Sequence, residues 1–178
     1  KVIGFSDTRS TSLVKGESLE DTVRMLSSYA DAIVIRHPDS KSAVRASKVS
    51  NVPVLNGGDG DGEHPTQTLL DLFSILETQG KIDGLTIGLS GDLKYGRTVH
   101  SLAKALKYYK VKLVLISDPL LAMPEAIIQE CQLAGVQIEL REKLDLKGLD
   151  VLYMTRYQKE RWASELDEVE TFVLTAAD

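Results

Sequence analysis

The sequence has a single cysteine, Cys131, three histidines and no long hydrophobic run. One cysteine cannot form an internal disulfide, and no charged and then apolar leader opens the chain. The longest apolar runs, such as 113–116, are far shorter than the roughly 20 residues that cross a bilayer. Positive charge is not in excess either, because 21 Lys and Arg stand against 26 Asp and Glu, a net charge of −5. We therefore expect a cytoplasmic protein that binds neither nucleic acid nor membranes.

The composition is that of an ordinary globular protein. The chain has 178 residues, of which 43% are hydrophobic and 26% charged. This length suffices for one domain or for two small ones, each with its own core. The composition excludes a disordered, collagen-like or coiled-coil chain.

Short apolar runs alternate with segments of helical period when Gly, Pro and Asn are taken as boundaries. Strands are expected at 2–6, 32–35, 52–55, 85–89, 112–116, 136–140 and 151–154, and helices after Ser18, at 42–48, after Pro65, at 98–109 and at 124–134. Several strands are apolar throughout, which is typical of a parallel sheet covered on both faces. The pattern predicts an α/β fold with two consecutive parallel-sheet units that divide near 78–84, the first at 1–78 and the second at 79–178.

Cationic and hydrogen-bonding residues follow four of these strands. They are Arg36-His37, the glycine-rich loop 56–63 that leads to His64, the loop 90–97, and the segment 155–159. Ligands of open parallel sheets bind beyond the carboxyl ends of the strands. Cationic or hydrogen-bonding residues at the ends of four strands of an acidic chain favour a small ligand with several negative charges, held by Arg guanidinium groups.

Other familiar sites are not indicated. The histidines have no metal-ligand spacing, and the position that would need a bidentate Glu in a calcium loop beginning at Asp59 holds Leu70. No Walker lysine motif, nucleophile elbow or dinucleotide fingerprint is present. The sequence therefore predicts no metal and no cofactor, and Cys131 is expected to pack as a small apolar residue.

Five stretches together carry a specific resemblance. They are Lys15-Gly16-Glu17-Ser18, Arg36-His37-Pro38, His64-Pro65-Thr66-Gln67, Gly91-Asp92-Leu93-Lys94-Tyr95-Gly96-Arg97 and Thr155-Arg156-Tyr157-Gln158-Lys159-Glu160-Arg161. With these motifs the chain resembles the central portion of the aspartate carbamoyltransferase catalytic chains along its whole length. The sister ornithine enzymes share the fold, but Thr66 and the stretch 156–161 favour aspartate as the acceptor.

The resemblance implies a role for each matching residue. Arg36, His64 and Gln67 would hold carbamoyl phosphate, with Arg36 and His64 as the catalytic residues that polarise its carbonyl. The residues implied to grip the two carboxylates of aspartate are Arg97, Arg156 and Gln158. Ser12 and Lys15 match a loop that, in this family, reaches the active site of a neighbouring subunit.

The resemblance also implies the reaction and the assembly. The α-amine of aspartate would attack carbamoyl phosphate and expel phosphate, a step of pyrimidine biosynthesis, in a homotrimer with shared active sites and with regulatory or pathway-enzyme partners. The family's phosphate-binding turn belongs upstream of Lys1 and its last helix beyond Asp178, so both domains are incomplete here and this polypeptide alone is not expected to be active. Two alternatives stay open: another amine acceptor such as ornithine, or a non-catalytic binding module of the same fold.

Overall fold

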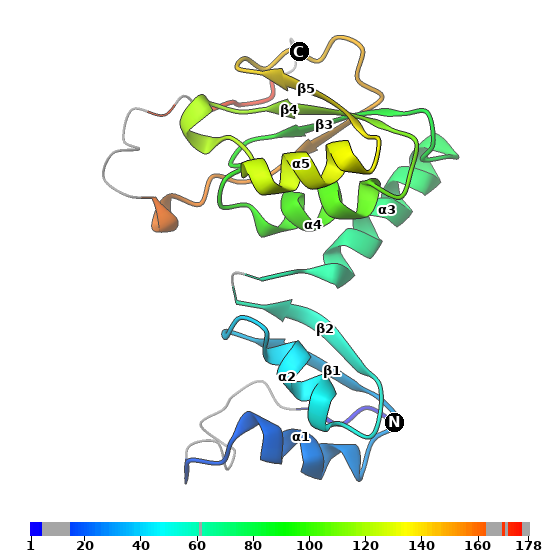
Figure 1. The fold of residues 1–178 in the computed structure, drawn as a ribbon, viewed down its shortest axis with the longest axis vertical. Helices are drawn as coiled ribbons and strands as arrows, with labels where there is room; N and C mark the ends of the chain where they lie inside the picture. Colours follow the sequence, from blue (N-terminus) through cyan, green and yellow to red (C-terminus); the bar gives the residue numbers. More distant parts are fainter. Residues whose placement is uncertain (5–14, 61, 163–168, 170, 176–178) are drawn as a thin grey trace. The chain divides into compact units, whose positions relative to one another are not determined.

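The computed structural model describes residues 1–4, 15–60, 62–162, 169 and 171–175. Contacts divide the chain into two compact units, Lys1–His64 and Pro65–Asp178. Both are α/β units with parallel sheets, as the sequence predicts (Figure 1). The division by contacts falls ahead of helix α3 (Pro65–Gln79), because Ile75 of that helix packs in the core of the second unit.

The first unit contains α1 (Leu19–Ser27), β1 (Ile33–His37), α2 (Ser42–Val49) and β2 (Val54–Asp59). Helix α1 begins as expected, because the Ser18 hydroxyl accepts a hydrogen bond from the Asp21 backbone N–H at 3.1 Å. Val23, Ile33 and Ala46 form the centre of a small core between the helices and the sheet. A single buried cluster of this size stabilises the unit only modestly.

The ends of the first two strands differ from the sequence prediction. Strand β1 runs two residues further than expected, through His37, and β2 includes 56–59, which were expected to be a loop. The reason is pairing: β1 and β2 are parallel, and His37 is the register partner of Asp59. Residues 2–4 of the first expected strand have no regular structure, and its last two residues lie outside the described part of the chain.

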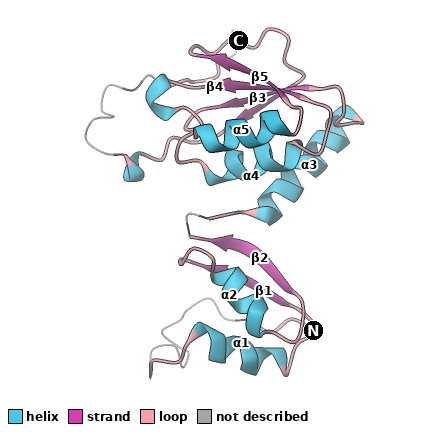
Figure 2. Ribbon diagram, in the orientation of Figure 1, coloured by secondary structure: helices cyan, strands magenta, loops and turns pink. Residues whose placement is uncertain are grey.

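The second unit is built on a four-stranded parallel sheet in the order β5-β4-β3-β6 (Figure 2). Its strands are β3 (Thr86–Ser90), β4 (Lys112–Ile116), β5 (Gln137–Arg141) and β6 (Val151–Met154). Between them lie the helices α4 (Arg97–Leu106) and α5 (Glu125–Leu133), together with the short 3-10 helix η3 (Pro119–Leu121). A further 3-10 helix, η4 (Lys159–Arg161), follows β6.

Both faces of this sheet are covered, which explains why residues 113–116 of β4 are all apolar. Leu113 and Leu115 pack in a core with residues of α3, α4 and α5, and Figure 1 shows these helices over one face. Val114 and Ile116 pack in a separate cluster with Phe172. Successive side chains of a strand point to opposite faces, so a strand between two cores has no polar face.

Strand order brings two loops together at the carboxyl end of this sheet. Strands β3 and β6 are parallel neighbours, and Ser90 is the register partner of Met154. The N–H of Thr155, the first residue after β6, donates to the carbonyl of Ser90, the last residue of β3, at 2.8 Å. The segments 91–97 and 155–162, which contain much of the predicted site, therefore start side by side.

Candidate functional site

In the first unit, Arg36 and His64 lie beside two consecutive glycines of β2. A Cβ atom built on Gly57 would lie 3.6 Å from Cβ of Arg36, and one built on Gly58 would lie 3.6 Å from Cδ2 of His64. Neither glycine carries a side chain that would separate the backbone of β2 from Arg36 or from His64. The structure thus brings the two predicted catalytic residues to one end of one sheet.

A buried carboxylate, that of Asp59, organises this end of the sheet. Only 5% of the residue is exposed. Its Oδ1 accepts hydrogen bonds from Asn56 Nδ2 at 3.1 Å and from the Glu63 N–H at 2.9 Å. Its Oδ2 accepts one from the N–H of Lys41 at 2.8 Å. Asp59 therefore ties the turn after β1 to the residue immediately before His64.

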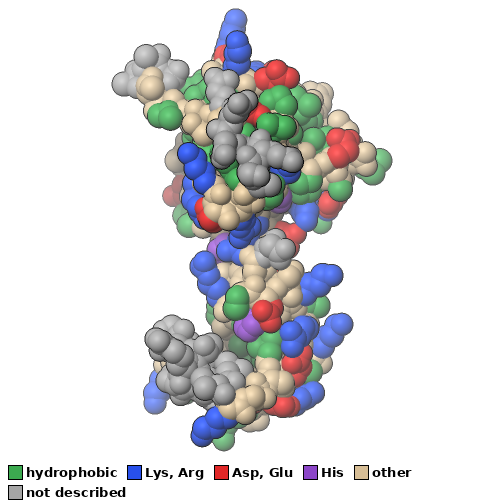
Figure 3. Space-filling view, turned by 90° about the vertical axis from the view of Figure 1, so that its left-hand side faces the viewer, with side chains coloured by type: hydrophobic (Ala, Val, Ile, Leu, Met, Phe, Trp, Pro, Cys, Tyr) green, Lys and Arg blue, Asp and Glu red, His purple; other side chains and the backbone are tan. Residues whose placement is uncertain are grey.

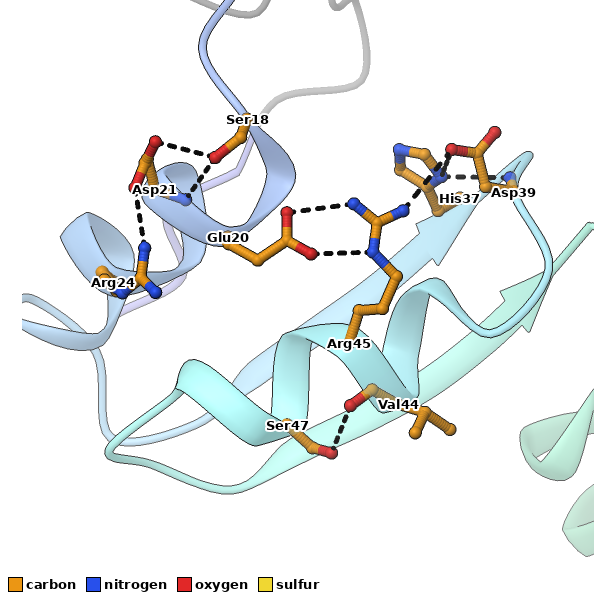
Figure 4. Close-up of polar contacts among 9 residues, drawn as sticks. All are labelled: Ser18, Glu20, Asp21, Arg24, His37, Asp39, Val44, Arg45 and Ser47. Carbon is orange, nitrogen blue, oxygen red and sulfur yellow. Dashed lines mark hydrogen bonds and ion pairs between the residues drawn. The ribbon is translucent and has the colours of Figure 1, made fainter.

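The turn after β1 is also held from the helix side, as Figure 4 shows. Arg45 of α2 donates two hydrogen bonds to the carboxylate of Glu20 in α1, at 2.7 and 3.0 Å, and lies 4.0 Å from Asp39. The bonded guanidinium lowers the pKa of Glu20. Nδ1 of His37 accepts a hydrogen bond from the Asp39 N–H at 3.0 Å. These contacts fix the segment that follows Arg36.

Gln67 lies in the first turn of α3, in the second unit. Its side-chain amide donates to Oδ1 of Asp71, one turn further on, at 2.9 Å. Asp71 is buried and also interacts with Tyr153 of β6, whose hydroxyl pKa is raised mainly by burial. Gln67 is thus oriented by a buried carboxylate that contacts the sheet.

Arg97 is the first residue of α4 and is half-buried. The loop before it is held to the helix by His100, whose Nε2 lies 2.7 Å from the carbonyl oxygen of Leu93. Since a carbonyl oxygen only accepts, Nε2 carries the proton of that bond. The loop also needs a glycine at its start, because Gly91 has φ +113° and a Cβ there would overlap the Thr155 carbonyl.

Asp92 joins the two loops at the carboxyl end of the second sheet. Its side chain is fully buried. Oδ1 accepts from the Tyr95 N–H at 2.9 Å, and Oδ2 accepts from the Gln158 N–H at 3.1 Å and from Nε1 of Trp162 at 3.0 Å. The side-chain amide of Gln158, itself buried, donates to the Tyr95 carbonyl at 2.7 Å. In this structure Gln158 therefore belongs to the framework that holds the loops together.

Arg156 extends from the same segment into solvent, where it forms an ion pair with Glu160. Its Nη2 lies 2.5 Å from Oε1 of Glu160, and the two side chains are 68% and 55% exposed. The hydrogen bonds raise the pKa of Arg156 and lower that of Glu160. An exposed ion pair of this kind contributes little to stability, so another carboxylate can replace Glu160 at small cost.

The remaining predicted residues are Lys15 and Ser12. Lys15 is exposed, ahead of α1, whereas Ser12 lies outside the residues that the structure describes.

Asp59 and Asp92 are absent from the predicted set. In the sequence both carboxylates come shortly after apolar runs, within glycine-containing segments, and such segments contain backbone N–H groups that need acceptors. That pattern was the signal available in the sequence.

The surface gives no sign of a large charged patch in the view of Figure 3, where basic and acidic side chains are interspersed over the coloured surface. Among the residues that the structure describes, no three His, Cys, Asp or Glu side chains are grouped so that they could hold a metal ion. None of the described helices is both long and apolar enough to span a membrane.

Two family models match the chain. The carbamoyl phosphate-binding domain of aspartate/ornithine carbamoyltransferases matches residues 1–77, and the aspartate/ornithine-binding domain matches residues 83–177. The aspartate carbamoyltransferase catalytic subunit of Thermococcus gammatolerans is 59% identical over 168 residues, which are 92% of this chain and 54% of that protein. The corresponding subunit of Chromobacterium violaceum is 53% identical over 163 residues, 90% of this chain and 54% of that protein.

Solved structures agree in fold. Aspartate transcarbamoylase of Trypanosoma cruzi, in complex with carbamoyl aspartate and phosphate, is 43% identical with a TM-score of 0.81, over 90% of this chain and 52% of that one. The catalytic subunit of M. jannaschii aspartate transcarbamoylase is 48% identical with a TM-score of 0.80, over 87% of this chain and 52% of that one. The chain thus spans about half the length of the relatives it matches.

Proposed function

Since this chain belongs to the aspartate/ornithine carbamoyltransferase family, we propose that the complete protein transfers the carbamoyl group of carbamoyl phosphate to the α-amine of L-aspartate. The products would be N-carbamoyl-L-aspartate and phosphate, as in pyrimidine biosynthesis. The observation that carries the proposal is the 53–59% identity to aspartate carbamoyltransferase catalytic subunits over at least 90% of this chain.

We propose that the carbamoyl phosphate side of the site is at the end of β2, within residues 1–78, with Gln67 contributing from α3. Arg36 and His64 each lie beside one of two adjacent glycines of β2, and both side chains can donate hydrogen bonds to an anionic ligand. Their role would be to stabilise the negative charge that develops on the carbonyl oxygen when the amine attacks. Asp59 supports this role because it fixes the residue before His64.

The aspartate side of the site, within residues 79–178, would use Arg97, Arg156 and Gln158. Arg97 begins a helix beside the loop that Asp92 joins to the segment of the other two residues. The guanidinium of Arg156 is exposed and already holds a carboxylate, that of Glu160, in a two-bond geometry. We propose that a carboxylate of aspartate replaces Glu160 there, and that Gln158 acts chiefly by fixing the loop.

The chemical step then requires that the two substrates are held in position and that the negative charge developing on the carbonyl oxygen is stabilised. The amine nitrogen of aspartate attacks the carbonyl carbon, a C–N bond forms, and the bond from that carbon to the phosphate oxygen breaks. The proton lost by the amine passes to the departing phosphate or to water. Alignment of the two substrates by fixed arginines lowers the entropic part of the barrier.

We further propose that the complete protein is a cytoplasmic homotrimer in which Ser12 and Lys15 of one subunit complete the site of the next. Closed, symmetric assemblies with sites shared between subunits are a common arrangement. The exposure of Lys15 in the single chain is compatible with this role.

The test is a direct assay on the purified complete protein. Carbamoyl phosphate is supplied with L-aspartate or with L-ornithine, and the carbamoylated amino acid and the phosphate are quantified. We expect N-carbamoyl-L-aspartate and phosphate in equal amounts, with little product from ornithine. If product forms from ornithine alone, the acceptor is ornithine and not aspartate. A folded protein that forms neither product would exclude the proposed activity.

A further inference from the structure

Trp162, the single tryptophan of the chain, is bonded to the most deeply buried carboxylate of the candidate site. Its indole N–H donates to Oδ2 of Asp92 at 3.0 Å, across 70 positions of sequence. The same oxygen accepts the Gln158 N–H at 3.1 Å. Hydrogen bonds to a fully buried carboxylate are stronger than neutral ones. Asp92 therefore holds this segment at two points four residues apart.

The segment between those two points is a single tight turn that ends at the tryptophan. The N–H of Arg161 donates to the Gln158 carbonyl at 2.8 Å, and the N–H of Trp162 donates to the Lys159 carbonyl at 3.2 Å. The indole ring also meets the ring of Tyr157 edge-on, with centroids 6.1 Å apart. The turn thus closes on itself and is fixed at its end by the indole.

Arg156 is joined to the same turn through Glu160, at the centre of η4 (Lys159–Arg161). A displacement of Trp162 would release the end of η4, and with it the backbone segment that begins at Arg156. It would also strain the bond that holds Gln158 on Asp92. No regular helix or strand longer than η4 holds the described residues 155–162, so these few bonds determine where the segment lies.

We propose that Trp162 is a positioning residue for the acceptor substrate. Its N–H, acting through Asp92, sets the place of Arg156 and Gln158 beside the loop that carries Arg97. This inference rests on the proposed function, since it assigns Trp162 to the aspartate side of that site. It also predicts that the carbamoyl phosphate side does not depend on the indole, because Arg36 and His64 belong to the first unit and Gln67 is held by Asp71 and not by Asp92.

The test uses Trp162→Phe, which keeps an aromatic ring and removes the N–H donor. We expect the KM for aspartate of the complete protein to rise about 10-fold or more, which corresponds to the loss of one hydrogen bond to a charged group. The KM for carbamoyl phosphate should change less than 2-fold, and kcat should stay within about 3-fold. Tyr108→Phe is the matched control, because Tyr108 is an exposed aromatic residue of the same unit and lies outside the site.

The possible results separate the inference from the proposed function. Wild-type protein without aspartate carbamoylation would overturn both. Active wild type with an unchanged aspartate KM in Trp162→Phe would overturn the inference alone. A fall in kcat that matches the loss of folded protein, with both KM values unchanged, would also overturn it and leave Trp162 a purely structural residue.

A second measurement follows the fluorescence of Trp162, the single tryptophan of residues 1–178, in a complete protein whose tryptophans outside these residues have been replaced by phenylalanine. With carbamoyl phosphate bound, titration with succinate, a dicarboxylate that has no amine to react, is expected to change the emission of Trp162 in a saturable manner. Carbamoyl phosphate alone is expected to change it little. An emission that succinate leaves unaltered would contradict the inference even where Trp162→Phe does not fold.

Discussion

Replacement of Asp59 by alanine tests how the end of the first sheet is held. The carboxylate accepts hydrogen bonds from Asn56, Lys41 and Glu63, at 3.1, 2.8 and 2.9 Å. Alanine removes all three acceptor interactions at once. Two of the three donors are backbone N–H groups of turns, and in the variant they can form hydrogen bonds with water only if the turns open.

The magnitude follows from these contacts. A hydrogen bond to a charged group contributes about 1.5–3 kcal/mol when it is buried, and about 1 kcal/mol where water can replace the acceptor. Three such bonds at a site 5% exposed give about 3–5 kcal/mol. The relatives are about twice as long as this chain, and at that size about 1 kcal/mol corresponds to about 1–2 °C in the melting temperature, so we expect Asp59→Ala to lower it by about 3 °C or more. Asp59→Asn should lower it less, because the amide retains one accepting oxygen.

The assay is thermal unfolding of the complete protein, with steady-state kinetics on the fraction that stays folded. Asp39→Ala is the control, since Asp39 belongs to the same turn but its carboxylate is exposed and has only the long contacts of 3.8 Å to His37 and 4.0 Å to Arg45, while its backbone bond to His37 is kept in the variant. We expect the control to shift stability by less than about 0.5 kcal/mol. The KM for carbamoyl phosphate should rise in the Asp59 variants alone. Equal melting temperatures for Asp59→Ala and Asp39→Ala would refute the reasoning.

Three further predictions concern the second unit and the charged surface. Gly91→Ala should abolish activity or folding, because its φ of +113° and the nearby Thr155 carbonyl exclude a Cβ; normal aspartate kinetics would contradict this. Hydrogen bonds to Arg and Lys lower the pKa values of Glu20 and Glu139 below 4.5, so the stability they add is present above pH 4.5 and is lost as the pH falls further; denaturant titrations should show this loss, weaker at high salt. Burial raises the pKa of Cys131 above 9.0, so a thiol reagent at pH 8 should modify it only as fast as the protein opens, and rapid modification of native protein would be inconsistent with the packing.

The sequence was informative where local patterns decide the structure. The cap at Ser18 and the limits of β4 and β6 agree with prediction, because capping and apolar runs are local signals. The extension of β2 through 56–59 could not be predicted in the same way. There the pairing with β1 outweighs the preference of glycine for turns.

The positions of the candidate cations relative to the predicted strands could be inferred from the sequence, whereas the contacts of the buried carboxylates could not. Arg36, Arg97 and Arg156 follow apolar runs, which places them at a sheet edge from sequence alone. The roles of Asp59 and Asp92 depend on contacts between distant positions. Asp92 bonds to residues 66 and 70 positions away, and no local pattern encodes such a distance.

The central claim is tested most directly by calorimetric titration of the complete protein with a bisubstrate mimic that joins a phosphonate to aspartate. Wild type should bind tightly. Arg156→Ala should bind about 100-fold more weakly, since about 3 kcal/mol of charged hydrogen bonding is removed. Arg24→Ala, which removes an exposed arginine of α1 paired with Asp21, should bind like wild type. A folded wild type that does not bind the mimic, or an Arg156→Ala variant that binds it equally well, would contradict the assignment of this chain to aspartate carbamoylation.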